Sequence, residues 1–277
     1  MRPSYDLIGE VPPASPVILS VPHAGRDYPP TVQSFARVPL AALTGLEDRH
    51  VDAVALAARG VETMIVQRVA RAWIDLNRAE HDRDPRIDDG APAGHLSAKV
   101  RSGLGLVPRR TSAAGELWRR RLSGDEVVAR IESTHRPYHA ALEAALKAAQ
   151  ARFGVAVLLD IHSMPPIAGS GARIVIGDRF GRAAASRFVG RIRDELVGWG
   201  IEYAVNAPYA GGHILERHGR PGAQIHAVQL EIDRTLYLDS RLDQPGAGFD
   251  QVVQLVRGII DVLADEAIAL PSSLAAE

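Results

Sequence analysis

The sequence predicts an α/β protein in which helices cover both faces of a sheet, and three observations predict it. Runs rich in Val, Leu and Ile are continuous rather than alternating, which indicates strands buried on both faces. These runs alternate with segments whose apolar residues recur at helical spacing. Several of the runs end in polar residues that can do chemistry, as expected where ligands bind beyond the carboxyl ends of strands. Together they predict a helix–sheet–helix sandwich.

Bulk composition fits one globular chain and excludes several classes of site. The 277 residues suffice for one large domain, and we treat 1–277 as a single domain. With 46% hydrophobic residues, 23% charged residues and a net charge of −1, nothing favours a nucleic-acid or membrane surface. The absence of cysteine excludes disulfides, thiol nucleophiles and Cys-ligated zinc, so His, Asp and Glu remain as metal ligands.

The N-terminal segment gives no sign of export. Met1 to Pro16 lacks a basic start followed by an apolar core, which a signal peptide would have. No apolar run reaches the length of a transmembrane helix. We therefore expect a soluble cytoplasmic protein, with its oligomeric state left open.

The first part of the chain is expected to form a strand, a helix and two further strands. A polar lead-in over 1–15 precedes a strand at 16–22. A helix is predicted from near Leu46 to Ala58, because its apolar residues share one face. The apolar runs at 61–68 and 71–76 are each read as a strand.

The region 79–116 is expected to be a long excursion with little regular structure. It is strongly charged between Glu80 and Asp89, and Pro85 and Gly90 interrupt it. Long loops in compact domains are usually functional or disordered. A lid over the site and a floppy surface loop are both consistent with this stretch, which we extend to 79–122 for a possible lid.

The second half of the chain alternates helices and strands again. Helices are predicted at about 125–152, 181–198 and 246–268, and strands at 155–161, 173–177, 201–206 and 225–232. The segment from Pro271 onward is expected to be disordered.

The stretch from Val155 to Ser163 carries the clearest chemical signal. Its apolar run ends in Asp160, Ile161 and His162. Asp160 and His162 point to the same side of a strand because side chains alternate. A carboxylate two residues from a histidine can fix the tautomer of the ring and leave its other nitrogen for a metal or a proton.

His23 and His162 each follow a predicted buried strand and are the best candidates for metal ligands. Two imidazoles brought together in this way suit zinc, which in catalytic sites also takes a carboxylate and keeps an open position. Asp48 is the preferred carboxylate, in the first turn of the helix that follows the first strand. Asp52 lies four residues further on the same face and stays a real alternative.

Glu231 is the natural general base. It ends an otherwise apolar strand, and a partly desolvated carboxylate has a raised pKa and accepts a proton from an activated water. Its purely structural alternative is a buried salt bridge, for example with Arg234.

Substrate-binding candidates lie in two loops. Asn77 and Arg78 can bind a substrate carboxylate through an amide and a guanidinium group. Their structural alternative is an ion pair with Asp75. Around Gly211 and Gly212 the backbone could approach a substrate closely, with Tyr209 and His213 flanking the pocket.

His135 and His139 lie one turn apart in the helix predicted at 125–152. No glutamate between them completes an HExxH pattern, and Pro137 would kink the helix there. We expect a packing role or a place at the edge of the substrate site for this pair, rather than metal binding.

Taken in order, these motifs resemble the N-formylglutamate amidohydrolase family over residues 17–238. The residues that carry the resemblance are Ser20-Val21-Pro22-His23-Ala24-Gly25, Asp48 with His50-Val51-Asp52, Ile74-Asp75-Leu76-Asn77-Arg78, Arg136-Pro137-Tyr138-His139, Asp160-Ile161-His162-Ser163, Gly211-Gly212 with Arg217-His218-Gly219-Arg220-Pro221, and Gln229-Leu230-Glu231 with Arg234-Thr235. The family resembles zinc carboxypeptidases and aspartoacylases, which implies a mixed, phosphorylase/hydrolase-like central sheet between helices.

The resemblance implies a site and a reaction. His23, His162 and an acid at 48 or 52 would hold zinc, Glu231 would activate water, and Asn77 with Arg78 would grip the substrate carboxylate. The reaction implied is release of formate from N-formyl-L-glutamate, a step of histidine catabolism. The segment 79–122 departs from the family pattern where substrate contacts are expected, which leaves the acyl-amino acid substrate open.

Two other functions remain open on the sequence. One is a carboxypeptidase- or aspartoacylase-like amidohydrolase acting on another amide. The other is a non-catalytic protein that binds a small carboxylate through Asn77 and Arg78.

Overall fold

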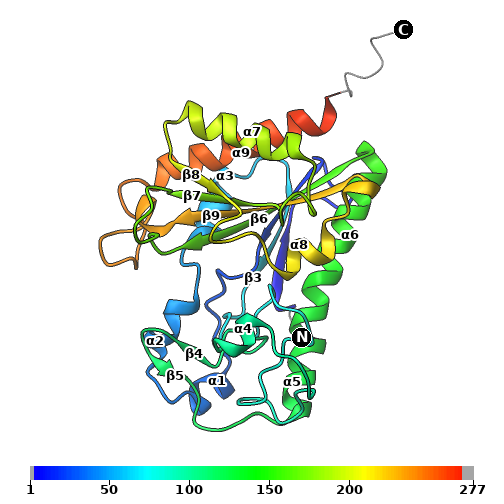
Figure 1. Ribbon diagram of the computed structural model, residues 1–277. Coiled ribbons are helices and arrows are strands. Elements are labelled where there is room, and N and C mark those ends of the chain that lie inside the picture. The colour runs from blue at the N-terminus through cyan, green and yellow to red at the C-terminus, as the bar shows by residue number, and fades with distance from the viewer. Residues whose placement is uncertain (1–2, 270–277) are drawn as a thin grey trace.

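The computed structural model describes residues 3–269, in which a seven-stranded sheet lies between two layers of helices (Figure 1). The predicted α/β sandwich is confirmed. The strands of the sheet are β1 (Tyr5–Ile8), β2 (Val17–Val21), β3 (Thr63–Gln67), β6 (Ala156–Met164), β7 (Ile174–Gly177), β8 (Tyr203–Val205) and β9 (Ile225–Asp233). Their spatial order is β1-β3-β2-β6-β9-β7-β8.

The sheet is mixed. Strands β3, β2, β6 and β9 run parallel to one another, and β7 is parallel to β8. The contacts of β1 with β3 and of β7 with β9 are antiparallel. Strand β6 is buried along its whole length between β2 and β9, which explains its continuous apolar sequence.

Helices cover the two faces unequally. The helices are α1 (Pro30–Phe35), α2 (Leu40–Leu43), α3 (Val51–Ala58), α4 (Ala98–Arg101), α5 (Gly124–Arg130), α6 (Arg136–Phe153), α7 (Ser186–Gly198), α8 (His213–His218) and α9 (Phe249–Ile268). Helices α3, α7 and α9 pack on one face, and α6 and α8 on the other (Figure 1). Within residues 3–269, no helix combines the length and the apolar character needed to cross a membrane.

The alternation of side chains along the central strands decides which groups meet. Along β6, Leu159 belongs to the core under α3, α7 and α9, and Leu158 to the core under α6 and α8. The side chains of Asp160 and His162 point to the same face of the sheet as Leu158. Glu231 on β9 lies directly across from His162 in the register. The apolar row beneath α6 and α8 therefore becomes polar at the carboxyl ends of the strands.

The region 79–116 is packed rather than floppy. It contains α4 and a small hairpin of β4 (Arg110–Thr111) and β5 (Gly115–Glu116), and it lies beside α1 and α2 in a lobe below the sheet (Figure 1). Leu106 and Leu117 are fully buried, and the ring of Trp118 stacks on Phe35 with 4.6 Å between centroids. The charges that suggested a loop lie largely in ion pairs, such as that of Arg109 with Asp84.

The prediction of a strand at 71–76 is wrong. The segment forms turns in which Arg71 and Asp75 pair as i and i+4 neighbours. The backbone N–H of Asp75 donates to Leu106 O, and its carboxylate accepts from the backbone N–H of Asn77. These local hydrogen bonds replace the bonds that a strand neighbour would have made.

The helix predicted from Leu46 begins later, at Val51. A single 3₁₀ turn covers Thr44–Leu46, and His50 has a φ of 57°, which no regular α-helix can contain. The backbone N–H of Asp48 donates to His23 O. Asp48 is therefore a loop residue next to His23 and not a residue of the first helical turn.

Two further boundaries differ from the predictions. The lead-in at 1–15 contributes the edge strand β1, which pairs with β3. The single helix predicted at 125–152 is divided by a π-helical turn, Ile131–His135, just before Pro137 in α6, since proline disturbs the regular hydrogen-bond pattern of the preceding turn. The disorder predicted from Pro271 lies outside the described residues.

Candidate active site

A cavity of about 420 Å³ opens at the carboxyl ends of β2, β6 and β9. Most of the candidates chosen from the sequence line it. They are His23, Asp48, Asn77, Arg78, His162, Tyr209, Gly212 and Glu231. The cavity is also lined by groups to which the sequence analysis gave no binding or catalytic role, namely Arg71, Lys99, Gln229 and Arg234.

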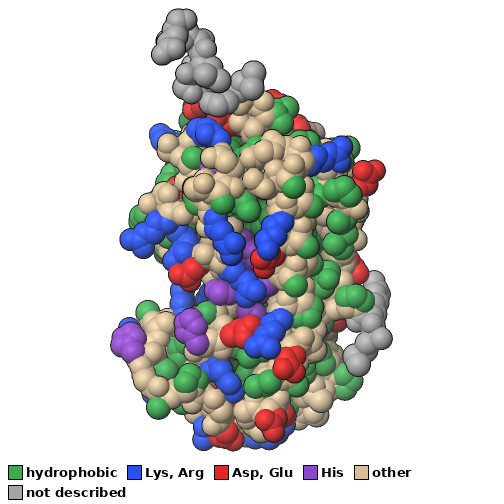
Figure 2. Space-filling model, turned by 90° about the vertical axis from the view of Figure 1, so that its right-hand side faces the viewer, with side chains coloured by type: hydrophobic (Ala, Val, Ile, Leu, Met, Phe, Trp, Pro, Cys, Tyr) green, Lys and Arg blue, Asp and Glu red, His purple; other side chains and the backbone are tan. Residues whose placement is uncertain are grey.

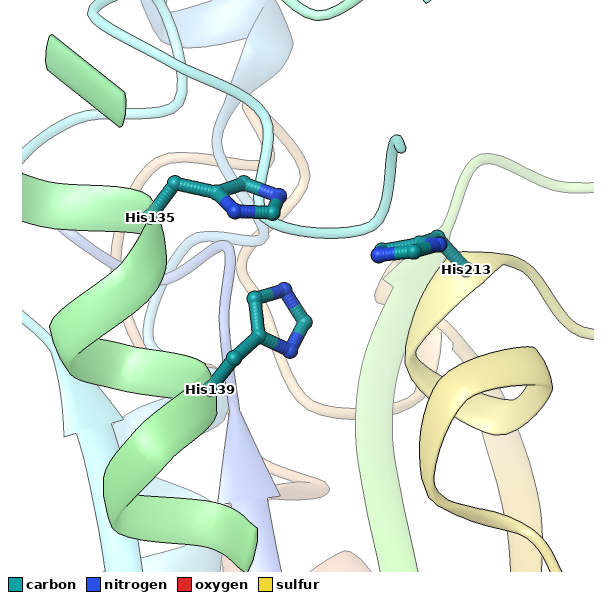
Figure 3. Close-up of side chains that lie close together, drawn as sticks. All are labelled: His135, His139 and His213. Atoms are coloured by element: carbon teal, nitrogen blue, oxygen red, sulfur yellow. The ribbon is translucent and has the colours of Figure 1, made fainter. Parts of the chain in front are cut away.

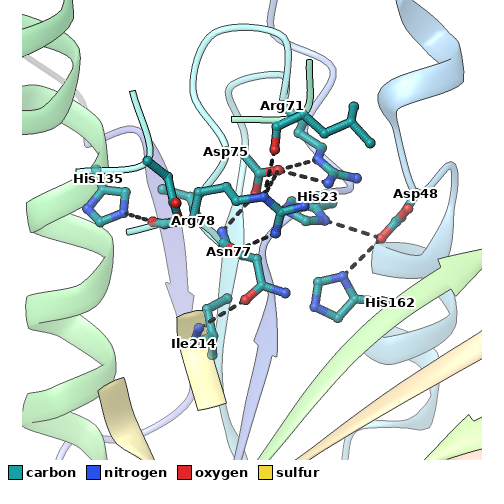
Figure 4. A network of polar contacts seen from close by, with 12 residues as sticks. His23, Asp48, Arg71, Asp75, Asn77, Arg78, His135, His162 and Ile214 are labelled. Atoms are coloured by element: carbon teal, nitrogen blue, oxygen red, sulfur yellow. Dashed lines mark hydrogen bonds and ion pairs between the residues drawn. The ribbon is translucent and has the colours of Figure 1, made fainter. Parts of the chain in front are cut away.

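His23, Asp48 and His162 converge on one point, as Figure 4 shows. One ligand atom from each lies within 4.8 Å of the others, and all three residues are buried. Asp48 Oδ2 is 3.6 Å from Nδ1 of His23 and 3.2 Å from Nδ1 of His162. The structure thus brings two distant histidines and an acid together.

Each of the two imidazoles is held from behind by a buried carboxylate. Nε2 of His23 donates to Asp75 Oδ1 over 2.8 Å, and Nε2 of His162 donates to Asp160 Oδ2 over 2.8 Å. Both carboxylates are fully buried. Since a carboxylate only accepts, Nε2 of each ring carries the proton and Nδ1 faces Asp48. Such carboxylate–histidine pairs orient the ligands of metal sites.

Asp48 and Asp52 have different partners. Asp52 lies apart from the histidines and pairs with Arg26 at the surface. Asp48 is buried, and its Oδ1 accepts from Nη2 of Arg234 over 2.9 Å, which turns Oδ2 toward the two rings. Burial opposes ionisation of Asp48, but hydrogen bonds from His162 and His23 outweigh it and hold the pKa of Asp48 well below its ordinary value.

His162 has a carboxylate at each ring nitrogen. Burial disfavours the imidazolium, yet Asp160 and Asp48 outweigh it and raise the pKa of His162 well above its ordinary value. The site therefore attracts positive charge. Two Nδ1 atoms and one carboxylate oxygen form a donor set that suits Zn²⁺, and a divalent cation competes for the position that a proton would otherwise take.

Glu231 lies in the same cavity, with only 8% of its surface exposed. Nε2 of Gln229 donates to its Oε1 over 2.9 Å. Burial raises the pKa of Glu231 to about 7, with His162 opposing and Asp48 adding to the rise. Arg234 bonds to Asp48 and Ser163. The structural alternative, a salt bridge of Glu231 with Arg234, is not among the ion pairs of the described residues.

Asn77 and Arg78 line the cavity, but many of their polar atoms already have partners. Oδ1 of Asn77 accepts from the backbone N–H of Ile214, and its Nδ2 donates to Oε1 of Gln229. Arg78 donates from Nε and Nη1 to the carbonyls of Leu104 and Asn77. Asn77 thus bridges α8 and β9, while Nη2 of Arg78 has no hydrogen bond to another residue within 3–269.

The loop before α8 contributes two of its three candidates to the cavity. Tyr209 and Gly212 line it, whereas His213 points to His135 and His139 instead, so its predicted place beside the pocket is wrong. At Gly212 the close approach is to Asn77, because a Cβ there would collide with the Asn77 amide. Gly211 has a φ of 101°, which favours glycine.

Four contributors escaped the sequence analysis for identifiable reasons. Asp75 was read only as a partner of Asn77 and Arg78. Its pairing with His23 depends on how a turn and a strand end meet. Arg71 and Lys99 come from segments without regular periodicity, and both lie over the cavity. Arg234 lies three residues after Glu231 and was considered only as the partner of Glu231 in a salt bridge.

Sequence comparison identifies relatives along most of the chain. A model of the N-formylglutamate amidohydrolase family matches residues 15–238. A protein of Pseudomonas putida named N-formylglutamate deformylase is 28% identical over 231 residues, which cover 81% of this chain and 82% of that protein. One of Pseudomonas aeruginosa with the same name is 25% identical and covers 92% of this chain and 93% of its own.

Solved structures show the same fold. The crystal structure of N-formylglutamate amidohydrolase from Ralstonia eutropha superposes with a TM-score of 0.84 at 32% identity, covering 95% of this chain and 97% of that chain. A gene product of Agrobacterium tumefaciens, at 17% identity and a TM-score of 0.70, shares the fold.

The contact of Gly212 with Asn77 yields a prediction about stability. We expect Gly212→Ala to lower the free energy of unfolding by about 1–3 kcal/mol, because its new methyl group displaces the Asn77 amide. Gly190→Ala, in α7 where a Cβ meets no atom within 4 Å, should raise it by roughly 0.5–1 kcal/mol. Urea unfolding measures both, and equal effects of the two substitutions would contradict the contact.

Proposed function

This chain belongs to the N-formylglutamate amidohydrolase family, and from that premise we propose that it hydrolyses the formyl amide bond of N-formyl-L-glutamate with the help of a bound zinc ion. The products are formate and glutamate, with one water consumed. The observation that carries the proposal is the arrangement of two carboxylate-oriented imidazoles and Asp48 beside Glu231 in one cavity.

The zinc ion would be held by His23, Asp48 and His162. Their donor atoms already converge, and Asp75, Asp160 and Arg234 fix the orientation of the three side chains. When bound, zinc supplies Lewis-acid chemistry, which lowers the pKa of a water to about 7 and polarises a carbonyl group.

Glu231 would act as the general base and acid. A carboxylate with a pKa near 7 can accept a proton at neutral pH and give it up again. It would take a proton from the attacking water as the C–O bond forms. It would return that proton to the amide nitrogen as the C–N bond breaks, so that glutamate leaves as an amine. Gln229 keeps the carboxylate in position through Oε1.

The basic groups of the cavity suit a substrate with two carboxylates. Arg78 would bind one of them through Nη2. Asn77, the residue before it, would hold this part of the chain in place through its hydrogen bonds to α8 and β9. Arg71 and Lys99 line the same cavity and would attract the second carboxylate. Tyr209 and Gly212 would border the bound substrate. The relation to zinc carboxypeptidases and aspartoacylases stays a prediction.

The experiment that tests the proposal is formate release from N-formyl-L-glutamate before and after treatment with a chelator. We expect turnover that the chelator abolishes and Zn²⁺ restores, with N-acetyl-L-glutamate and glutamyl dipeptides turned over more slowly. Preference for a dipeptide or an N-acetyl substrate would favour a carboxypeptidase- or aspartoacylase-like amidohydrolase that acts on another amide. Binding of N-formyl-L-glutamate without turnover, with zinc present, would favour a non-catalytic protein.

Glu231→Gln should retain zinc and lose turnover. The amide keeps the shape of the side chain but cannot accept a proton, so kcat should fall by about 100- to 10,000-fold. Zinc content by elemental analysis should equal that of the wild type. The matched control is Glu132→Gln, whose side chain is 62% exposed, and its kcat should stay within about twofold. Near-normal turnover by Glu231→Gln would remove Glu231 from the base role.

Asp48→Asn and Asp52→Asn should differ sharply in their zinc dependence. The neutral amide at position 48 weakens the site, so the free zinc concentration that gives half-maximal formate release should rise by at least about tenfold. Asp52 pairs with Arg26 at the surface, and its replacement should leave that concentration unchanged. A larger effect at 52 than at 48 would reverse the assignment.

A further inference from the structure

A second cluster of histidines lies beneath the Leu76–Arg78 segment. His135 ends the π-helical turn, His139 lies in α6, and His213 begins α8 (Figure 3). The three rings face one another, with 4.4 to 5.8 Å between their centroids. One ring nitrogen from each lies within 4.8 Å of the others. None of the three residues lines the cavity described above.

Three ring nitrogens of this cluster are buried without a hydrogen bond among the described residues. They are Nδ1 of His135 and both nitrogens of His213. Leaving a buried polar atom without a hydrogen bond typically costs about 1–3 kcal/mol, so a group that satisfies several of them at once is stabilised there.

The remaining hydrogen bonds resemble those behind metal ligands. Nε2 of His135 donates to Arg78 O over 2.8 Å, and Nε2 of His139 donates to Leu76 O over 3.0 Å. Metal-binding histidines commonly donate their other N–H to a backbone carbonyl or a carboxylate. Nδ1 of His139 accepts from Nε2 of His218, so His139 must open one of its two hydrogen bonds to bind an ion.

The charge state of the rings also suits a cation. Burial lowers the pKa of His213 to about 4 and of His218 to about 3, and it lowers the pKa of His135 and His139 too. The rings are therefore neutral at pH 7, which is the form that binds metals. His218, placed behind His139, can orient that ring without binding the ion.

One residue of the cluster is partly exposed. His213 is only half-buried. Figure 2 shows the side of the molecule where α6 and α8 lie, and basic and acidic side chains gather on it. The ion pair of Arg136 with Glu80 lies at the surface here, and Glu80 Oε1 is 3.9 Å from Nδ1 of His135. A cation at the cluster would thus have an acidic neighbour.

We propose that His135, His139 and His213 form a second binding site for a divalent transition-metal ion such as Zn²⁺, behind the segment that carries Asn77 and Arg78. Three neutral imidazoles suit such ions, with a water completing a tetrahedral site. Zinc–nitrogen bonds of about 2.0–2.1 Å place the nitrogens roughly 3.4 Å apart, so the rings must close in slightly. The proposal does not depend on zinc binding at His23, Asp48 and His162.

Cobalt binding to His213→Cys tests the site directly. The natural chain has no cysteine, so a thiolate-to-cobalt charge-transfer band in the near ultraviolet can arise only from the new side chain. We expect this band on adding one equivalent of Co²⁺ to the folded variant. The band should disappear when His135→Gln is added to His213→Cys, because a second ligand is then lost.

The control is His95→Cys, which places a thiol at an exposed histidine outside both clusters and should give no band. In the natural sequence background, equilibrium dialysis should show that His213→Gln binds one Zn²⁺ per chain fewer than the wild type, while Asp48→Asn keeps that ion. A folded His213→Cys protein without the band, or equal zinc content of His213→Gln and wild type, would overturn the proposal. In that case the unpartnered nitrogens are satisfied by water.

Discussion

The candidate active site depends on two buried carboxylates that hold the backs of two imidazoles. Asp75 and Asp160 accept from Nε2 of His23 and His162, so both Nδ1 atoms turn toward Asp48. Burying two carboxylates has a high desolvation cost unless charge-assisted hydrogen bonds compensate for it. Arg71 compensates for Asp75, and Ser20 with His162 compensates for Asp160. These buried carboxylates hold the two rings in a fixed orientation, which is the function that we infer for them.

The sheet produces this arrangement because side chains alternate between its two faces along each strand. Alternate residues of β6 and β9 form an apolar row under α6 and α8, and the same row becomes polar at the carboxyl ends of the strands. Asp160, His162, Gln229 and Glu231 all belong to it. The packed region 79–116 contributes Lys99 and Leu104 to the lining of the cavity. The loop at 71–78 then links the two histidine clusters, because its side chains line the cavity while its carbonyls accept from His135 and His139.

The parts of the site that follow from strand alternation could be predicted from the sequence. The same-side placement of Asp160 and His162 depends only on the local pattern, and burial is the largest cause of the raised pKa of Glu231. Asp48 and Asp52 could not be separated, because a helix start five residues too early put both on one face, and the left-handed conformation of His50 is not visible in the sequence. The role of Asp75 depends on a turn that was taken for a strand. His213 was assigned to the wrong cluster, because only the packing of α8 against α6 decides which way it points.

The most direct measurement of the central claim is anomalous X-ray diffraction from crystals grown with zinc, recorded on both sides of the zinc absorption edge. The account predicts an anomalous peak bonded to Nδ1 of His23, Nδ1 of His162 and a carboxylate oxygen of Asp48, with Asp75 and Asp160 still bonded to the opposite ring nitrogens. A zinc-dependent, active protein whose crystals show no peak between these three residues would contradict it.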